Sequence, residues 1–247
     1  MDILGILVDN ESVKGAIVDS TNGIIRSETK SVEAASDTRP HKLISKMHKI
    51  VKKFNWEGPV GVAVPAAVRK GRILSTSILD EAWVDADADH LFSEITGCDV
   101  QVLNSSDAAG LAEIRWGIGK GVAGTVMVLT IGENIGSSVF VNGNLVPNTD
   151  LGNIEIKGIT VEERASNKVR KEEGIQRKTW AKRLQFVLEH LEKLFHPELF
   201  IIGGQISSKA DKTLPYIKLN TRFKLAEFKN NAALLGAAYY VSKNKMK

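Results

Sequence analysis

The stretch TVMVLTI at residues 125–131 decides how this chain is expected to fold. It has no charged side chain, and a short apolar run of this kind is typical of a strand that is buried on both faces of a sheet. A second run, PVGVAV at residues 59–64, has the same character. Two such strands predict an α/β protein, in which helices cover the sheets.

Hairpins and helices surround these two strands in the same order. The first cluster comprises expected strands at residues 3–8, 13–18 and 24–29, a helix at 40–54 and the strand at 59–64. The second comprises the strand at 125–131, a hairpin of 136–141 and 144–146, a helix at 178–195 and a strand at 199–202. This weak internal duplication predicts two α/β lobes.

Shorter elements complete the expected organisation. They are a helix at 87–95, a strand at 100–103, and helices at 105–116 and 231–241. We expect an N-terminal small lobe over residues 1–104, with the C-terminal helix of 231–247 packing back on it. A larger C-terminal lobe is expected over residues 105–230.

The composition of the 247 residues excludes several classes of protein. The single Cys98 excludes an intrachain disulfide and any multi-cysteine metal site. The five histidines show no metal-ligand spacing, so no metal site is expected. No apolar run approaches the ~20 residues of a membrane span. The N-terminal MDILGILVDN lacks the basic region of a signal peptide, which makes the cytoplasm the default location.

The net charge of +4 conceals an uneven distribution. Residues 73–112 contain no Lys or Arg, whereas Lys42, Lys46, Lys49 and Lys53 recur on one face of the expected helix at 40–54. These lysines are either a solvated helix face or a groove for phosphates.

Polar residues follow the expected strand at 100–103, where ligands of open α/β sheets commonly bind. Asn104 and Ser105 stand at this strand end. The structural alternative is a helix start, with Ser105 or Ser106 as the N-cap and Asp107 in the first turn.

Three turns could meet an anion, and each could equally be a plain turn. The turn at residues 8–12 has no glycine and carries Asp9 and Glu11, which would repel a phosphate. The turn at 132–136 keeps two glycines but inserts Glu133, which is expected to face the phosphates. Gly203 and Gly204 stand at a strand-to-helix junction, where an anion could meet the helix.

Taken in order, these segments resemble the ROK family of sugar kinases, and most closely its polyphosphate glucokinase branch. The resemblance is carried by LGILVDNESVKGAIVD (4–19), GPVGVAV (58–64), LNSSDAAGLAE (103–113), LTIGENIGSSVF (129–140), LVPNTDLG (145–152), EERAS (162–166) and LFIIGG (199–204). It implies the actin-like, ribonuclease-H-like two-lobed sugar kinase fold. It also implies a cytoplasmic, commonly dimeric enzyme that uses Mg²⁺ and transfers a phosphoryl group from polyphosphate or ATP to glucose.

The sequence departs from the family at the positions that the chemistry needs. Leu7, Val8, Asp9 and Asn10 stand where the first phosphate loop reads Asp-Ile-Gly-Gly. Ser105 replaces the catalytic Asp after the retained Asn104, and loss of a general base typically lowers the rate by about 10²–10⁴. In the second loop Glu133 and Asn134 replace Thr-Gly.

The sugar site is altered in the same way. Ile78 replaces an Asn, and Asp150-Leu151-Gly152-Asn153 replaces Glu-x-Gly-His. The expected sugar-binding remnants are therefore Asn104, Asp150, Asn153 and Glu162. The expected phosphate-loop remnants are Asp9, Asn10, Lys14, Gly132, Asn134, Gly136, Gly203 and Gly204.

Three hypotheses follow for the function. The first is a pseudoenzyme that has lost glucose phosphorylation and acts by binding a sugar or polyphosphate, or by pairing with a subunit. The second is a divergent active kinase of glucose or another sugar, with Asp107 or Asp9 as the base. The third is a sugar-responsive regulator, but the kinase-like strand begins at residue 3 and leaves no room for a helix-turn-helix, so no nucleic-acid partner is expected.

Overall fold

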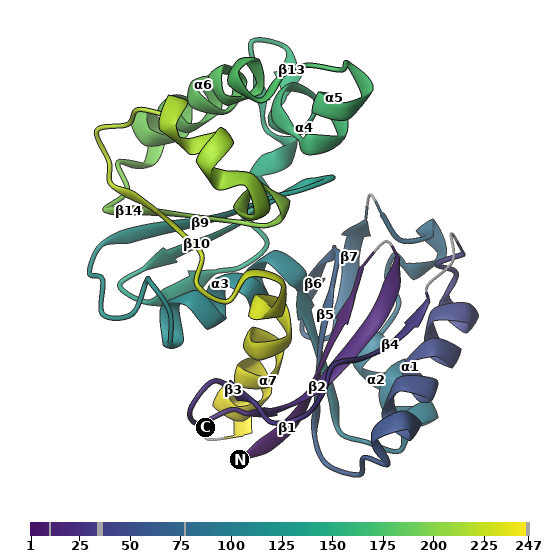
Figure 1. The fold of residues 1–247 in the computed structure, drawn as a ribbon. Coiled ribbons are helices and arrows are strands. Elements are labelled where there is room, and N and C mark those ends of the chain that lie inside the picture. Colours follow the sequence, from purple (N-terminus) through teal and green to yellow (C-terminus); the bar gives the residue numbers. More distant parts are fainter. Residues whose placement is uncertain (10, 34–36, 77, 246–247) are drawn as a thin grey trace. The chain divides into compact units, whose positions relative to one another are not determined.

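The computed structural model describes residues 1–9, 11–33, 37–76 and 78–245, so Asn10 lies outside the described residues. The chain divides into two compact units (Figure 1). Unit 1 comprises Met1–Ala112 and Asn231–Lys247, and unit 2 comprises Glu113–Asn230. Each unit is built around its own mixed sheet.

The sheet of unit 1 has the order β3-β2-β1-β5-β8, and β4 also pairs with β2. Its strands are β1 (Asp2–Val8), β2 (Ser12–Asp19), β3 (Ile24–Ile25), β4 (Lys30–Glu33), β5 (Val60–Val64) and β8 (Val100–Asn104). β1 and β2 form an antiparallel hairpin, whereas β5 pairs in parallel with both β1 and β8. All five residues of β5 are buried, as the PVGVAV run predicts.

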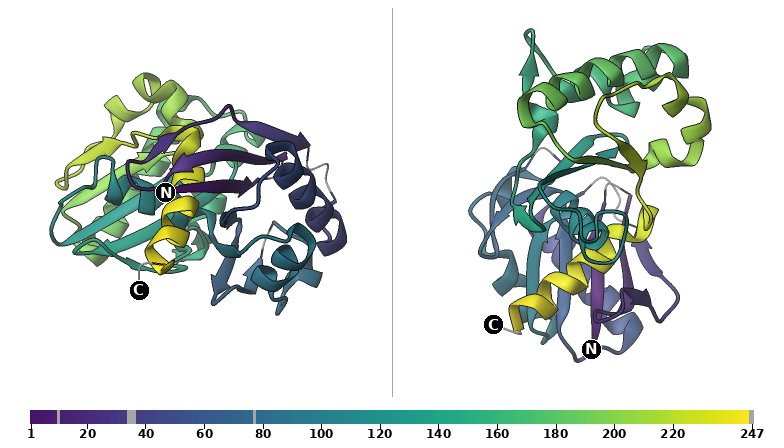
Figure 2. Two further views of the ribbon diagram at one scale, coloured as in Figure 1. Left: turned by 90° about the horizontal axis from the view of Figure 1, so that it is seen from below. Right: turned by 90° about the vertical axis from the view of Figure 1, so that its left-hand side faces the viewer.

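Helices cover both faces of this sheet. On one face, Leu4 and Ile6 share a core with Met47 and Ile50 of α1 (Pro40–Phe54) and with residues of α2 (Ala88–Thr96). α7 (Ala232–Lys245) packs on the opposite face (Figure 2). Gly5 and Gly61 permit this packing.

A Cβ atom on either glycine would collide with the backbone of α7. On Gly5 it would lie 2.3 Å from the carbonyl oxygen of Leu234, and on Gly61 it would lie 2.2 Å from that of Ala237. The apolar strands predict burial on both faces, and these two glycines determine how closely the helix approaches.

A hairpin that the sequence did not predict follows β5. It consists of β6 (Ala66–Arg69) and β7 (Arg72–Thr76), and the 3-10 helix η1 (Glu81–Trp83) follows it. Lys70 and Gly71 at the turn both have positive φ, 52° and 77°, as in the turns that join short hairpins. Lysine is uncommon at such a position, so the turn left no clear signal in the sequence.

The sheet of unit 2 repeats the plan of unit 1. Its order is β11-β10-β9-β14-β15, with β9 (Thr125–Ile131), β10 (Ile135–Val141), β11 (Asn144–Val146), β14 (Leu199–Gly203) and β15 (Phe223–Leu225). β10 and β9 are antiparallel, and β14 is parallel to β9 and to β15. The same succession of an antiparallel hairpin and two parallel strands supports the predicted duplication.

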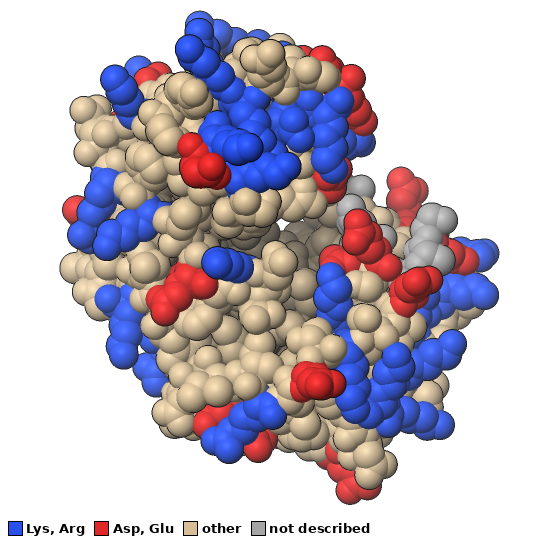
Figure 3. All heavy atoms as spheres, viewed as in Figure 1, with Lys and Arg blue, Asp and Glu red and all other residues tan. Residues whose placement is uncertain are grey.

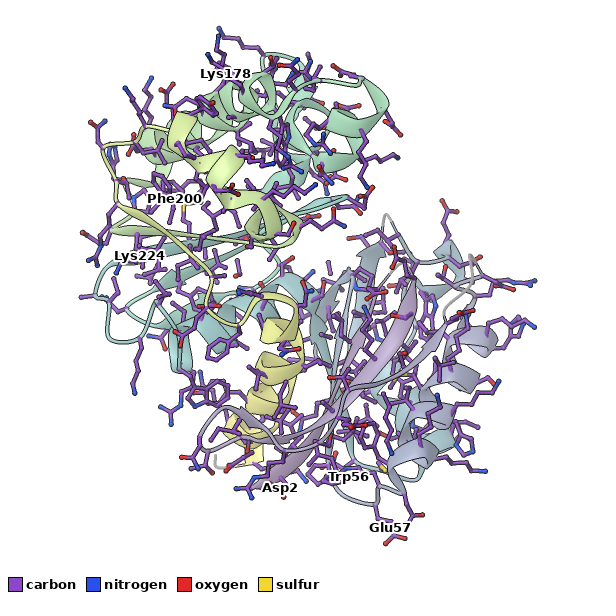
Figure 4. All side chains as sticks on the ribbon, in the orientation of Figure 1. Asp2, Trp56, Glu57, Lys178, Phe200 and Lys224 are labelled. Atoms are coloured by element: carbon purple, nitrogen blue, oxygen red, sulfur yellow. The ribbon has the colours of Figure 1, made fainter. Side chains whose placement is uncertain are left out.

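α6 (Arg177–Phe195) covers one face of this sheet. Its apolar face places Trp180, Leu184 and Leu188 in one core with Met127 and Phe200. Figure 4 labels Phe200 on β14 and Lys178 on α6. The charged segment after residue 160 forms α4 (Val161–Ala165) and α5 (Asn167–Glu172). A capping box between Thr160 and Glu163 starts α4.

Short elements connect the rest of unit 2. They are β12 (Glu155–Ile156), β13 (Ile159–Thr160) and the 3-10 helices η2 (Leu151–Asn153), η3 (Gln205–Lys212), η4 (Leu214–Tyr216) and η5 (Lys229–Asn231). Among the described residues, no helix is both long and apolar enough to cross a membrane.

The boundary between the units differs from the expected boundary, which lies between residues 104 and 105. The chain leaves unit 1 after Ala112, within α3 (Ser105–Arg115), and unit 2 is the shorter unit. The start of α3 belongs to unit 1 because it lies against α7. A Cβ on Gly236 would lie 1.6 Å from the carbonyl oxygen of Ala108, so the two helices are in backbone contact.

Candidate functional site

The first candidate loop joins β1 to β2, and the Asp9 carboxylate occupies its hydrogen-bond donors. The backbone N–H groups of Glu11 and Ser12 donate to Asp9 Oδ1 at 2.9 Å and 2.7 Å. The Lys14 ammonium donates to Asp9 Oδ2 at 2.8 Å. A phosphate would need the same donors. The loop therefore already holds an anion, supplied by its own side chain.

These contacts also set the protonation state of Asp9. Burial would raise the pKa of its carboxyl group, but the hydrogen bonds from Lys14 and from the two backbone N–H groups outweigh it and leave the pKa below its ordinary value. Asp9 is therefore a weaker base than an ordinary aspartate. This disfavours it as a substitute general base.

Asn104 has a structural role at the end of β8. Its Oδ1 accepts the backbone N–H groups of Ser106 at 2.8 Å and Asp107 at 3.1 Å, and its Nδ2 donates to the carbonyl oxygen of Ala66 at 2.9 Å. The predicted N-cap at Ser105 or Ser106 is thus wrong, because the Asn104 amide satisfies the first donors of α3.

Ser105 is the first residue of α3 and is half-buried. Unit 1 also contains two other altered positions, Leu7 and Ile78. Leu7 lies in β1 opposite Lys14 of β2, and Ile78 is half-buried after β7. Both place apolar atoms where the resemblance expects polar groups. Asp107 is buried in the first turn of α3.

The second candidate loop, between β9 and β10, is held by carboxylates of unit 2. Glu162 accepts hydrogen bonds from Asn134 Nδ2 and, at 3.0 Å, from the backbone N–H of Ile135. Glu133 pairs with Lys171 of α5. Glu133 was expected to face phosphates, whereas here its charge is neutralised by a neighbouring cation.

The remaining sugar-site residues of unit 2 pair with one another. Asn153 Nδ2 donates to Asp150 Oδ2 at 2.5 Å, within the turn around η2. Between them, Gly152 is buried, and a Cβ there would lie 2.3 Å from the carbonyl oxygen of Ile135. The structure therefore brings Gly152 beside Glu162 and Asn134, at the start of β10.

The two glycine turns of unit 2 are neighbours. Gly132 lies against the side chain of Gln205, which follows Gly203 and Gly204. Gly204 has φ of 82°, and a Cβ there would lie 2.8 Å from the backbone of Ile131, so only glycine fits. Gly136 lies in β10 opposite Thr130.

Asn167 joins these two turns, and sequence reasoning missed it. Its backbone N–H donates to the carbonyl oxygen of Gly132 at 2.8 Å, and its Nδ2 donates to Gln205 Oε1 at 2.8 Å. Its Oδ1 accepts Nε–H of Arg170 at 2.7 Å. No motif marks Asn167, because Gly132 and Gln205, the residues of the two turns that it joins, lie more than thirty residues away along the chain.

Potential metal ligands do not cluster in threes among the described residues. Among them no group of three or more His, Cys, Asp or Glu side chains is arranged to hold a metal ion. Mg²⁺ that arrives with a phosphoryl donor is usually held by one or two carboxylates. Asp9 is engaged by Lys14, and Ser105 supplies no carboxylate.

Comparison with known proteins relates the chain to sugar kinases. A model of the ROK family matches residues 3–150. Polyphosphate glucokinase of Mycobacterium tuberculosis is 38% identical over 235 residues, which cover 95% of this chain and 89% of the relative.

Two solved structures resemble the fold. Inorganic polyphosphate/ATP-glucomannokinase from Arthrobacter sp. strain KM matches with a TM-score of 0.95 and 36% identity, over 98% of this chain and 99% of that one. A ROK family glucokinase from Streptomyces griseus, in complex with glucose and AMPPNP, matches with a TM-score of 0.80 and 18% identity, over 96% and 98%.

Proposed function

Since this chain belongs to the ROK family and has its actin-like α/β fold, we propose that it is a polyphosphate-glucokinase-like protein that has lost phosphoryl transfer to glucose. The observation that carries the proposal is the Asp9 carboxylate. This carboxylate accepts hydrogen bonds from two backbone N–H groups of the first candidate loop and from the Lys14 ammonium. A phosphoryl donor would have to displace a covalently attached anion and face its negative charge.

The position of the general base supports the same conclusion. The hydroxyl of Ser105 cannot accept a proton usefully near pH 7, and Asn104 beside it is used to cap α3. The remaining candidates are Asp9, which is ion-paired with Lys14, and Asp107, which is buried in the first turn of α3, and these positions disfavour both as substitutes for the missing base.

The sugar and second-loop residues support it further. Asp150 is hydrogen-bonded to Asn153, and Glu162 to Asn134 and Ile135. Sugar hydroxyls would have to compete with these internal partners. A weak sugar site, with glucose or a related sugar as its ligand, is therefore the expected remnant.

A coupled assay of glucose 6-phosphate tests the proposal. The full chain would be incubated with glucose, Mg²⁺ and either inorganic polyphosphate or ATP. We expect no turnover above that of an Asp150→Ala variant. Turnover that the Asp150→Ala variant lacks would overturn the proposal in favour of a divergent active kinase, which would then need Mg²⁺ with its polyphosphate or ATP donor. A screen of other sugars as acceptors belongs to the same test.

Two expectations from the resemblance stay predictions. A homodimer is tested by light scattering of the purified chain, and a cytoplasmic location by cell fractionation. Neither is needed for the loss of phosphoryl transfer.

A further inference from the structure

Unit 2 carries a strongly basic face. Figure 3 shows Lys and Arg side chains gathered over the helices of this unit. The segment from α5 to the middle of α6 contains seven basic residues, Lys168, Arg170, Lys171, Arg177, Lys178, Lys182 and Arg183. Among the described residues only Lys171 and Arg183 of this set form ion pairs, with Glu133 and Glu173. Most of the positive charge on this face is not neutralised.

Two of these cations lie over a single aromatic ring. The Cζ atoms of Arg170 and Arg177 lie 5.7 Å and 6.0 Å from the centroid of the Trp180 ring. That ring is rigidly placed, because Trp180 is 1% exposed and its indole N–H donates to the carbonyl oxygen of Ala165 at 2.8 Å. A guanidinium that stacks on an aromatic face keeps its N–H groups free at its edge.

Arg170 is also held at its inner end. Its Nε donates to Asn167 Oδ1, and Asn167 is itself fixed to Gln205 and to Gly132. Within the described part of the chain, the terminal nitrogens of Arg170 make no hydrogen bond, and Arg177 makes neither a hydrogen bond nor an ion pair. The guanidinium groups of Arg170 and Arg177 are therefore held in place, while their terminal N–H groups have no hydrogen-bond acceptor among the described residues.

The two arginines also repel each other. Burial and then the charge of Arg170 lower the pKa of Arg177, and the carboxylate of Asp211 opposes this effect. The guanidinium stays protonated near neutral pH. Like charges held this close are stabilised by a bound anion.

We propose that Arg170 and Arg177, on the Trp180 platform, form a binding site for a phosphoanhydride chain. Guanidinium groups bind phosphate oxygens in bidentate geometry, and two of them over one ring match a ligand with several charges in a small volume. An acidic peptide would place single carboxylates at wider spacing and would gain less from this arrangement. The site requires no phosphoryl transfer, so it goes beyond the proposed loss of activity.

The direct test is calorimetric titration of the full chain at near-physiological ionic strength, without glucose. The probes are inorganic tripolyphosphate, long-chain inorganic polyphosphate and ATP. We expect the double variant Arg170→Gln/Arg177→Gln to weaken binding at least tenfold. The matched control Lys120→Gln/Lys224→Gln removes two exposed charges from unit 2 outside α5 and α6 and should change the Kd less than twofold.

A conservative pair of variants separates geometry from charge. Arg170→Lys/Arg177→Lys keeps both charges but removes the planar forks, and we expect it to weaken binding several-fold. It also serves if the glutamine variant does not fold, which thermal unfolding would reveal. Tighter binding of inorganic chains than of ATP supports an inorganic ligand, and the reverse order supports a nucleoside triphosphate.

Three results would overturn the site. They are no binding of any probe to the unaltered chain, equal weakening in the Lys120→Gln/Lys224→Gln control, and full binding by the Arg170→Lys/Arg177→Lys variant. Formation of glucose 6-phosphate is measured separately, so failure of this site and failure of the proposed loss of activity are distinguishable.

Discussion

The carboxylate of Asp9 lies 2.8 Å from the ammonium group of Lys14, at the turn between the first two strands of unit 1. The same carboxylate accepts two backbone N–H groups of the turn. An aspartate thus provides, within the chain, the negative charge that this kind of loop would otherwise take from a phosphate.

Replacing Asp9 should open the loop to anions. The Asp9→Gly variant frees Lys14 and the N–H groups of Glu11 and Ser12, so we expect tighter binding of inorganic phosphate or tripolyphosphate, measured by calorimetry. The change should lower the free energy of unfolding by about 1 kcal/mol, because the contacts are partly exposed. Asp9→Glu, which keeps the charge, is the control, and equal binding by both variants would contradict the role assigned to Asp9.

Asn104 should matter to stability more than the serines that follow it. Asn104→Ala removes the acceptor for the N–H groups of Ser106 and Asp107, so we expect a loss of about 1 kcal/mol in the free energy of unfolding. Ser105→Ala should change it by less than about 0.5 kcal/mol. Urea denaturation of the two variants compares them, and a larger loss in Ser105→Ala would show that the cap is misassigned.

Gly61 should not tolerate a side chain. Gly61→Ala would place a Cβ 2.2 Å from the carbonyl oxygen of Ala237, so α7 must shift from the sheet. We expect a loss of about 3 kcal/mol, as for overpacked cores. Gly132→Ala is the matched control, because the nearest atom to its Cβ would be 3.5 Å away. Thermal unfolding should leave the control near the unaltered chain.

Asp89 should make the stability depend on pH. Burial raises the pKa of its carboxyl group to about 6, while the hydrogen bond from the Val102 N–H opposes the rise. The folded state favours the protonated carboxyl. The contribution of this group to the free energy of unfolding is therefore fully present below about pH 4 and is lost as the pH rises through about 6.

The Asp89→Asn variant keeps an acceptor for Val102 but cannot ionise. We expect it to gain stability relative to the unaltered chain between pH 4 and pH 7, by at most about 2 kcal/mol after allowance for the partial exposure of the carboxyl. Urea denaturation at both pH values measures the difference. A constant difference between the two chains at both pH values would contradict the raised pKa.

Repair of the altered positions should restore some transfer only when both the base and the loop are changed. Ser105→Asp alone leaves Asp9 in contact with Lys14, so we expect no glucose 6-phosphate. Ser105→Asp combined with Leu7→Asp, Asp9→Gly and Ile78→Asn should give measurable turnover, since a general base typically contributes about 10²–10⁴ in rate. Activity in the single variant would show that the donor loop is still open.

The amphipathic and apolar segments were predictable because their signal is local. The helix predicted at residues 40–54 and the strand predicted at 125–131 have the observed bounds of α1 and β9. The apolar residues of the helix recur with the helical period, and the strand is a continuous apolar run. The hairpin of β6 and β7 was missed because its turn depends on positive φ at Lys70, which residue type alone does not indicate.

The site divides in the same way. The sequence by itself determined which chemical groups stand at positions 105 and 7, because serine and leucine cannot act as carboxylates in any fold. Only the tertiary structure decided what the remaining groups do: Asp9 holds Lys14, Glu162 holds the loop at Asn134, and Asn167 orients Arg170. Glu162 and Asn134 are 28 residues apart in the chain. Asn167 and Arg170 are close in the chain, but Asn167 is itself fixed by Gly132 and Gln205, which are distant from it. Their partners are chosen by packing and by the need of buried polar atoms for hydrogen bonds, which no local pattern records.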